Sequence, residues 1–364
     1  MKKTGLLIFT NHIFPWHVGG SEIVVDKIAS EIAKHRDVIV CGGDIPSDQE
    51  YKNYYHKKIT NTIDLFETLS KFSSYKIFIY SDGYLFSRHI FNWAKRRDRE
   101  IFLAPVGFNI CREKKAILDM VVENPKISFI YHDSNYVDYE LGKNLLHINN
   151  RRHCIIPNGY DPEEFSSIEK SDLIDKKIIT TVANTFPFKG HDLCIHVLDE
   201  LSKTEKFEYH IFCTTPSWVV AKMKLKWLLE KSSKREWMHV HVDSRREKMI
   251  KYLSASKCML FLSQKEVSPL VLIESCAAKI PWVSFDVGNA NSIPGGFIVE
   301  AQADGNGNKI MSTEVCDSVK IVIMSILNSG KNTNTDTDII DDFLNKRSWS
   351  NISRSYDEFF FHNK

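Results

Sequence analysis

Short apolar runs alternate with amphipathic stretches along almost the whole chain, beginning with Gly5-Leu6-Leu7-Ile8-Phe9. Short apolar runs bounded by polar residues are typical of buried strands, whereas apolar residues three and four apart indicate helices. Regular alternation of the two predicts parallel sheets covered by helices, which is the α/β class. In the first half we expect strands at Leu6–Thr10, Val38–Cys41, Ile77–Tyr80, Ile101–Ala104, Ser128–Tyr131 and Cys154–Ile156, and helices at Glu22–Lys34, Phe86–Arg96 and Asn135–Leu146.

The same pattern restarts after a polar stretch at 161–176. We expect the strands of this second half at Lys177–Ala183, Tyr209–Phe212, His239–Val242, Cys258–Leu262, Trp282–Phe285 and Phe297–Val299. Two such halves predict two doubly wound domains with a ligand cleft at the carboxyl ends of their strands. We place the domains at 1–160 and 161–345, with a loop at 328–338 and a last amphipathic helix in 346–364 that opens at Arg347-Ser348-Trp349.

One segment of the second half combines a strand, a polar loop and a helix start. The apolar run Cys258–Leu262 predicts a buried strand, and Ser268 is suited to cap a helix that begins at Pro269 and extends to residue 278. The free N–H groups of such a helix start form an anion site. Glu266 would stand at its mouth, and Glu274 would lie roughly 7–8 Å along the helix axis. Two acceptors beside a phosphate site suit the hydroxyl groups of a sugar nucleotide.

These residues resemble a known family. Glu266-x7-Glu274, followed by Ser275-Cys276-Ala277-Ala278-Lys279-Ile280-Pro281-Trp282-Val283-Ser284 and Asp286-Val287-Gly288, looks like the donor site of retaining GT-B glycosyltransferases of family 4. The resemblance implies two Rossmann-like domains facing across a cleft, with the C-terminal helix returning to the first domain. It also implies that Glu266 contacts the donor sugar and Glu274 the ribose. The loop residues of this donor site would be Val267, Ser268, Pro269 and Leu270.

Two further loops fit the resemblance. Gly19 and Gly20 follow the first strand, and Ser21 is suited to cap the next helix; the family has a glycine loop here, beside the donor phosphates and the acceptor. Lys189 precedes a helix and is placed to neutralise a diphosphate as a point charge. The family usually adds an arginine, but the corresponding position here is Asn184. Without the resemblance, we would interpret the Gly19-Gly20 loop as an ordinary turn and Lys189 as a solvent-exposed lysine.

Other polar residues are weaker candidates. Arg245 opens a helix in a turn that lies near the nucleotide base in the family, and Asn158 belongs to a Pro-Asn-Gly turn at the domain boundary. The family histidine of the first domain is missing from the stretch 104–109. We therefore consider other residues for the acceptor side, with His132 as the catalytic candidate. The remaining members of this group are His12, His17 and Asp133.

The composition of the chain limits the classes of partner that we expect. The formal charge of +2 makes a nucleic-acid partner unlikely. Eight cysteines without a Cys-x-x-Cys pair read as reduced thiols in a cytoplasmic protein. We find no signal peptide and no apolar segment of about 20 residues that would span a bilayer. The basic run Lys95-Arg96-Arg97 follows Phe91 and Trp93, so peripheral contact with the inner face of a membrane stays open.

The sequence thus predicts a retaining enzyme that transfers a hexose-type sugar from a UDP- or GDP-linked donor to a glycan, a glycolipid or another hydroxyl acceptor, in bacterial-type polysaccharide or glycolipid assembly. The resemblance implies front-face attack, in which the departing phosphate takes the acceptor proton. We expect no metal and no cofactor, because Lys189, the helix start and the glycine loop would stabilise the leaving group. Two alternatives remain: a catalytically weak sugar-nucleotide- or glycan-binding protein, and a sugar-nucleotide epimerase.

Overall fold

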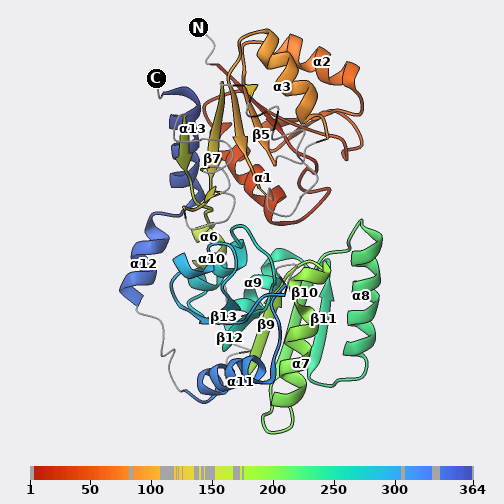
Figure 1. Ribbon diagram of the computed structural model, residues 1–364, viewed down its shortest axis with the longest axis vertical. Coiled ribbons are helices and arrows are strands. Elements are labelled where there is room, and N and C mark those ends of the chain that lie inside the picture. Colours follow the sequence, from red (N-terminus) through yellow and green to blue (C-terminus); the bar gives the residue numbers. More distant parts are fainter. Residues whose placement is uncertain are drawn as a thin grey trace. The chain divides into compact units, whose positions relative to one another are not determined.

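The computed structural model describes residues 4–81, 85–106, 119, 121, 123–124, 126–134, 139–140, 143, 152–166, 173, 176–304, 308–329 and 337–362. They form two compact units (Figure 1). The first unit comprises residues 1–159 and 349–364, and the second comprises residues 160–348. The last helix, α13 (Trp349–Phe361), therefore belongs to the first unit, although it follows the second unit in sequence.

The first unit is built on a sheet with the strand order β3-β4-β2-β1-β5-β6-β7-β8. Only β3 pairs antiparallel with its neighbour, and all other pairs are parallel. The six strands expected here are present within a residue of their predicted bounds, whereas the edge strand β3 and its neighbour β4 were not expected because they are polar and partly exposed. The strands are β1 (Leu6–Phe9), β2 (Val38–Gly42), β3 (Gln49–Tyr51), β4 (Tyr54–Lys58), β5 (Lys76–Tyr80), β6 (Ile101–Ala104), β7 (Ile127–Tyr131) and β8 (His153–Ile155).

Helices of the first unit include α1 (Gly20–Ile32), α2 (Thr62–Lys71) and α3 (Ser87–Arg96). The helix expected at 135–146 lies largely outside the described residues. Helix α13 packs beside α1, and the Phe360 ring contacts Phe102 and Phe78 with centroids 4.8 and 5.1 Å apart. Asp357 on α13 pairs with Arg36 just after α1. Aromatic packing and an ion pair thus hold the C-terminal helix on the first unit.

The second unit has an all-parallel sheet with the order β11-β10-β9-β12-β13-β14. The order reverses at β9, whose neighbours are β10 on one side and β12 on the other, which makes β9/β12 the topological switch point. The strands are β9 (Ile178–Val182), β10 (Glu208–Cys213), β11 (Met238–Val242), β12 (Cys258–Phe261), β13 (Trp282–Phe285) and β14 (Gly296–Val299).

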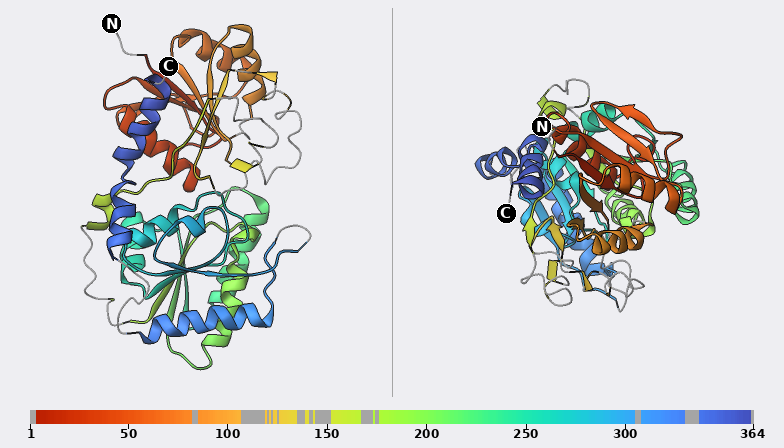
Figure 2. Two further views of the ribbon diagram at one scale, coloured as in Figure 1. Left: turned by 60° about the vertical axis from the view of Figure 1, so that its left-hand side comes forward. Right: turned by 90° about the horizontal axis from the view of Figure 1, so that it is seen from above.

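Helices cover both faces of this sheet (Figure 2). Alternation along the strands separates two apolar cores: Tyr209 and Ile211 of β10 face one, and Phe212 faces the other. The expected linker contains a short helix, α6. The helices are α6 (Pro162–Ser166), α7 (His191–Leu201), α8 (Val219–Ser232), α9 (Arg246–Ala255), α10 (Leu270–Ala277), α11 (Thr313–Asn328) and α12 (Thr337–Asn345).

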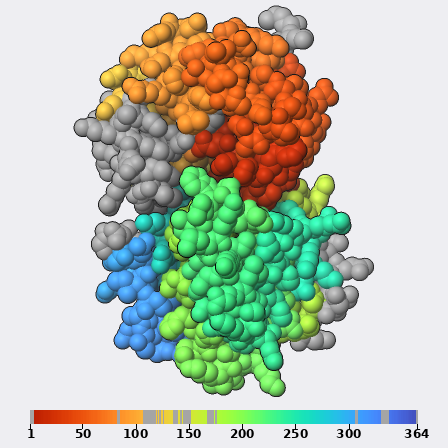
Figure 3. Space-filling view, turned by 90° about the vertical axis from the view of Figure 1, so that its right-hand side faces the viewer, coloured from red at the N-terminus to blue at the C-terminus, as the bar shows by residue number. Residues whose placement is uncertain are grey.

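Helix α8 lies on the surface of the second unit, among the green residues of Figure 3. It buries Ala221 and Leu228, while Val219, Val220 and Met223 are exposed. These exposed apolar residues are adjacent or one turn apart at the start of the helix. None of the helices formed by the described residues combines the length and the apolar character needed to cross a bilayer.

Candidate active site

Two loops meet at the switch point of the second unit. One follows β9 and contains the short 3-10 helix Pro187–Lys189, and the other follows β12. The two loops approach each other closely at Gly190. Its φ of 69° lies in the left-handed region, and a Cβ at this position would lie 1.9 Å from the carbonyl oxygen of Leu262. Only glycine fits both demands. The backbone N–H of Gln264 also donates to the Phe188 carbonyl at 2.7 Å. The loop after β9 is therefore fixed against the loop after β12.

Lys189, expected beside the diphosphate, and Glu266, expected beside the donor sugar, are each other's partner. The Lys189 Nζ donates to Glu266 Oε1 at 2.6 Å. Their side chains are only 15% and 10% exposed, so the pair is largely removed from water. Desolvation makes such a pair costly unless both charges keep good partners. A diphosphate and a sugar hydroxyl are suitable replacement partners for the cation and the carboxylate, respectively.

The helix after Glu266 starts one residue later than expected. Pro269 occupies the N-cap position of α10 with extended backbone, and the helix runs over Leu270–Ala277. The prediction that Ser268 caps it is wrong, because the Ser268 hydroxyl accepts from Asn289 Nδ2 at 3.1 Å, and no side chain caps the helix. The N–H groups of the first turn thus stay without a side-chain cap, as an anion site requires.

A second glycine supports this loop from the side of β13. Gly288 has a φ of 57°, and a Cβ at this position would lie 2.4 Å from the carbonyl oxygen of Val267. The Asp286-Val287-Gly288 segment therefore packs directly against the backbone beside Glu266. The loop is held between two glycine contacts, one from each neighbouring segment.

Glu274 is the fifth residue of α10, and its side chain is 6% exposed. Its Oε1 accepts from Arg246 Nη2 at 2.7 Å, and Arg246 Nε donates to Glu164 Oε2 at 2.6 Å. Burial lowers the pKa of Arg246, but the two carboxylates outweigh it and raise that pKa above its usual value. One oxygen of Glu274, the expected ribose ligand, is thus already held by a permanent cation.

Sequence reasoning selected Arg245 and missed Arg246. Arg245 is the exposed N-cap residue of α9, whereas Arg246 is the first residue of the helix and points toward Glu274. The buried residues of α9 include Met249, Ile250 and Leu253, which lie three, four and seven positions after Arg246. This spacing puts Arg246 on the core face of the helix, and it is the signal that would have separated the two arginines.

Asn184, at the position where the family has an arginine, shapes the turn after β9. Its Oδ1 accepts from the Phe186 N–H at 3.2 Å, and its carbonyl accepts from His191 Nε2 at 2.8 Å. Burial lowers the pKa of His191 to about 4, so this imidazole is neutral. The histidine, which sequence reasoning did not select, anchors the segment that carries Lys189.

In the first unit the glycine loop leads into α1. Gly19 is the N-cap residue and Gly20 the first helical residue, so Ser21 does not cap the helix as expected. The Glu22 side chain folds back over Gly19, where its Oε2 would lie 2.5 Å from an added Cβ. Burial raises the pKa of Glu22, although its hydrogen bond to the backbone and the nearby His12 and His17 lower it. The glycine thus makes room for this carboxyl group.

The expected acceptor-side histidines divide into two groups. His12 Nδ1 and His17 Nε2 lie 3.0 and 3.1 Å from Asp44 Oδ2, and the hydrogen bond to Asp44 raises the pKa of His12. His132, by contrast, is 2% exposed, with its ring nitrogens 3.1 Å from the Tyr80 hydroxyl and 3.0 Å from the Ile156 carbonyl. The structure therefore counts against the catalytic role assigned to His132, because neither nitrogen is open to a substrate.

The other candidates of the first unit, Asp133 and Asn158, are also buried, with 9% and 4% exposure.

Among the described residues, two clusters bring three potential metal ligands within 4.8 Å of one another. One is His12, His17 and Asp44, and the other is Glu208, His210 and His239. Neither cluster includes Lys189, Glu266 or Glu274.

Comparison with known proteins agrees with this geometry. Residues 164–297 match the model of the family described as glycosyl transferases group 1. No curated protein sequence matches the chain significantly. Three similar solved structures each cover nearly the whole of both chains. They are the trehalose-6-phosphate synthase OtsA (12% identity, TM-score 0.72, 99% of this chain and 100% of that one), sucrose-phosphate synthase from Thermosynechococcus elongatus (14%, 0.72, 98% and 98%) and Anabaena Alr3699/HepE in complex with UDP and glucose (12%, 0.71, 99% and 100%).

At these identities the structural likeness shows the fold, which is GT-B. The family match covers the segment from Glu164 to β14, and therefore both loops that carry Lys189 and Glu266. Fold and matched domain together define a glycosyltransferase. The residues that match the glycosyl transferases group 1 model all lie in the second unit.

Proposed function

We propose that this glycosyltransferase is a retaining enzyme of family 4 that moves a hexose-type sugar from a nucleoside-diphosphate donor to a hydroxyl group. The observation that carries the proposal is the Lys189–Glu266 pair at the carboxyl ends of β9 and β12. Open α/β sheets bind their ligands outside this edge, at the switch point. Lys189 and Glu266 offer a cation and a carboxylate at one largely buried place. A donor with a charged diphosphate and a neutral sugar has a suitable group for each of them.

Donor binding would exchange the partners of this pair. The diphosphate takes Lys189, a hydroxyl of the sugar donates to Glu266, and neither charge is left buried without a partner. As the glycosidic bond breaks, negative charge grows on the departing phosphate. Lys189 and the N–H groups at the start of α10 stabilise that charge, which is electrostatic catalysis.

Arg246 prepares the other end of the donor site. Because it holds Glu274 Oε1, the remaining oxygen is oriented to accept from a ribose hydroxyl. In front-face attack, the departing phosphate oxygen takes the proton of the acceptor. No separate base is then needed, which fits the engagement of both nitrogens of His132.

For the donor we propose a UDP- or GDP-sugar. The structure of Alr3699/HepE, which was solved with UDP and glucose, supports the UDP option. For the acceptor we propose a glycan, a glycolipid or another alcohol in polysaccharide or glycolipid assembly, and we propose that neither metal nor cofactor takes part. The free cysteines among the described residues support the proposed cytoplasmic location.

A binding protein without turnover is the second candidate. It is favoured by Asn184, which takes the place of a cation, and by the neutralisation of Lys189 by Glu266. The two candidates differ in one product. An enzyme releases a nucleoside diphosphate from its donor, whereas a binding protein leaves the donor intact.

The experiment has two stages. Thermal-shift measurements against UDP-, GDP- and ADP-sugars find the donor, because a ligand that binds the native state raises apparent stability. Release of the nucleoside diphosphate is then measured with a mixture of sugar alcohol, oligosaccharide and glycolipid acceptors. Glu230→Ala on the surface of α8 is the control, since it removes a carboxylate far from both loops in sequence. Stabilisation without any nucleotide release would favour the binding protein, and no stabilisation by any donor would contradict both.

A further inference from the structure

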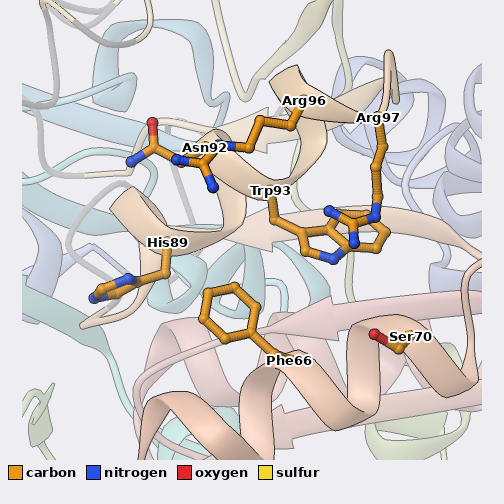
Figure 4. A pocket seen from close by; sticks show the side chains of 7 residues that line it. All are labelled: Phe66, Ser70, His89, Asn92, Trp93, Arg96 and Arg97. Carbon is orange, nitrogen blue, oxygen red and sulfur yellow. The ribbon is translucent and has the colours of Figure 1, made fainter.

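A separate pocket lies in the first unit, between α2 and α3 (Figure 4). Its volume is about 420 Å³, which is within the usual range for small-molecule sites. Phe66 and Ser70 line it from α2, and Trp93, Arg96 and Arg97 line it from α3 and the residue that follows. None of these residues belongs to the loops that carry the proposed donor site.

Trp93 is the unusual member of this pocket. Its side chain is buried, with 5% exposure, yet the indole Nε1 has no hydrogen-bond partner among the described residues. Almost all buried N–H groups in proteins are paired, so an orphaned donor calls for an explanation. In Figure 4 the indole nitrogen faces the side of the pocket formed by Phe66 and Ser70 of α2. An acceptor atom of a ligand in the pocket would supply the missing partner once the side chains that cover the nitrogen move aside.

The charge of the pocket defines that acceptor further. Neither Arg96 nor Arg97 forms an ion pair within the described part of the chain, whereas the adjacent Lys95 pairs with Glu123 at 3.4 Å. The Arg97 guanidinium instead lies 4.8 Å from the centre of the Trp93 ring. No aspartate or glutamate is among the described residues that line the pocket. The Arg97 guanidinium beside the orphaned N–H, with the Arg96 guanidinium on the Asn92 side of the pocket, makes an anion-binding site.

We propose that this pocket binds a phosphomonoester. A phosphate offers three acceptor oxygens, enough for the indole N–H, the Ser70 hydroxyl and one arginine fork. Phe66 is 40% exposed and stands edge-on to His89 at 6.2 Å, so it provides an apolar wall for the organic part of the ligand. The phosphate belongs either to a soluble small molecule or to a lipid headgroup.

The lipid option uses this pocket and not the aromatic residues of α3. Phe91 and Trp93 are 2% and 5% exposed, so neither is available to enter a bilayer. The basic residues that follow them would instead receive a phosphate group. The inference does not depend on the proposed glycosyl transfer, because no residue of the pocket takes part in it.

The test follows the indole proton of Trp93 by NMR. The protein labelled with ¹⁵N-tryptophan has seven indole signals, and the one absent from Trp93→Phe is that of Trp93. We titrate glycerol 3-phosphate, and separately add phosphatidylcholine vesicles with and without phosphatidic acid. Arg96→Gln/Arg97→Gln removes the pocket charge, and Arg88→Gln, an exposed arginine of α3 that does not line the pocket, is the matched control.

A selective shift of the Trp93 signal by glycerol 3-phosphate supports the pocket with a soluble ligand. A shift or broadening of that signal only with phosphatidic acid vesicles supports it with a lipid ligand. In either case the apparent Kd should rise at least about tenfold in Arg96→Gln/Arg97→Gln and stay unchanged in Arg88→Gln. An unmoved Trp93 signal with both probes, or equal binding by the double variant, would overturn the proposal.

Discussion

Lys189 Nζ lies 2.6 Å from Glu266 Oε1, so two residues that follow different strands share one ion pair at the switch point of the second sheet. Each of the two side chains is the partner of the other. The account of function depends on the exchange of this pair for a phosphate and a sugar hydroxyl.

Lys189→Ala should therefore weaken binding of UDP or GDP much more than binding of uridine or guanosine. Only the diphosphates present a charge to the lysine, and loss of one charge-assisted hydrogen bond corresponds to about tenfold or more in Kd. Isothermal titration calorimetry of the four ligands measures the difference. Lys222→Ala, on exposed α8, is the control. Equal losses for nucleoside and nucleotide would separate Lys189 from the phosphates.

Arg246→Leu should destabilise the protein by about 2 kcal/mol, because it leaves Glu274 buried without its cation. This value is below the penalty for a fully buried pair, because the Arg246 side chain is partly exposed. The neighbouring substitution Arg245→Leu should change the free energy of unfolding by less than about 0.5 kcal/mol. Urea denaturation of both variants gives the comparison. Similar effects in both would show that the Arg246–Glu274 contact contributes nothing.

Stability should also decline in mild acid through His191. Burial lowers the pKa of this histidine in the folded chain to about 4, against 6.5 for an ordinary histidine. Between these two values the unfolded chain binds the proton and the folded chain does not, so folding is favoured above pH 6.5 and loses stability as the pH falls toward 4. The full loss is on the order of 3 kcal/mol.

The variant for this test is His191→Gln, whose side-chain amide can still donate to the Asn184 carbonyl but does not titrate. The free energy of unfolding is measured by urea denaturation from pH 7 to pH 4. It should fall less steeply with acid in the variant than in the parent protein. Parallel curves would show that His191 does not titrate between the folded and unfolded states.

Glycosyl transfer should persist after removal of divalent metal ions. The proposed stabilisers of the leaving group are Lys189 and the start of α10, and both candidate metal clusters consist of other residues. Product formation is assayed after dialysis against EDTA, with and without added Mn²⁺. Loss of activity on chelation that Mn²⁺ restores would contradict the assigned role of Lys189.

Much of the fold could be predicted because buried parallel strands appear in the sequence as short apolar runs. The edge strand β3 and its neighbour β4 escaped prediction because their residues are polar and partly exposed. The positions of Glu266, Glu274 and Lys189 along their elements also followed from local pattern. Their partners did not, since the Lys189–Glu266 and Arg246–Glu164 contacts join residues 77 and 82 positions apart in sequence.

The two predicted serine caps show a different limit. Both Ser21 and Ser268 are good N-cap residues by type, but glycine and proline occupy the N-cap positions instead. At Ser268 the hydroxyl is used by Asn289, a contact from another loop. Local preference is weak enough for one tertiary hydrogen bond to override it.

The most direct test of the central claim is the anomeric form of the sugar that leaves the donor. With the α-linked donor found by thermal shift, slow hydrolysis by the enzyme is followed by ¹H NMR before the free sugar mutarotates. The account predicts that the first sugar released is the α anomer, and that Glu266→Ala lowers the rate by about 10²-fold or more while Glu230→Ala does not. Initial release of the β anomer, or an unchanged rate in Glu266→Ala, would contradict it.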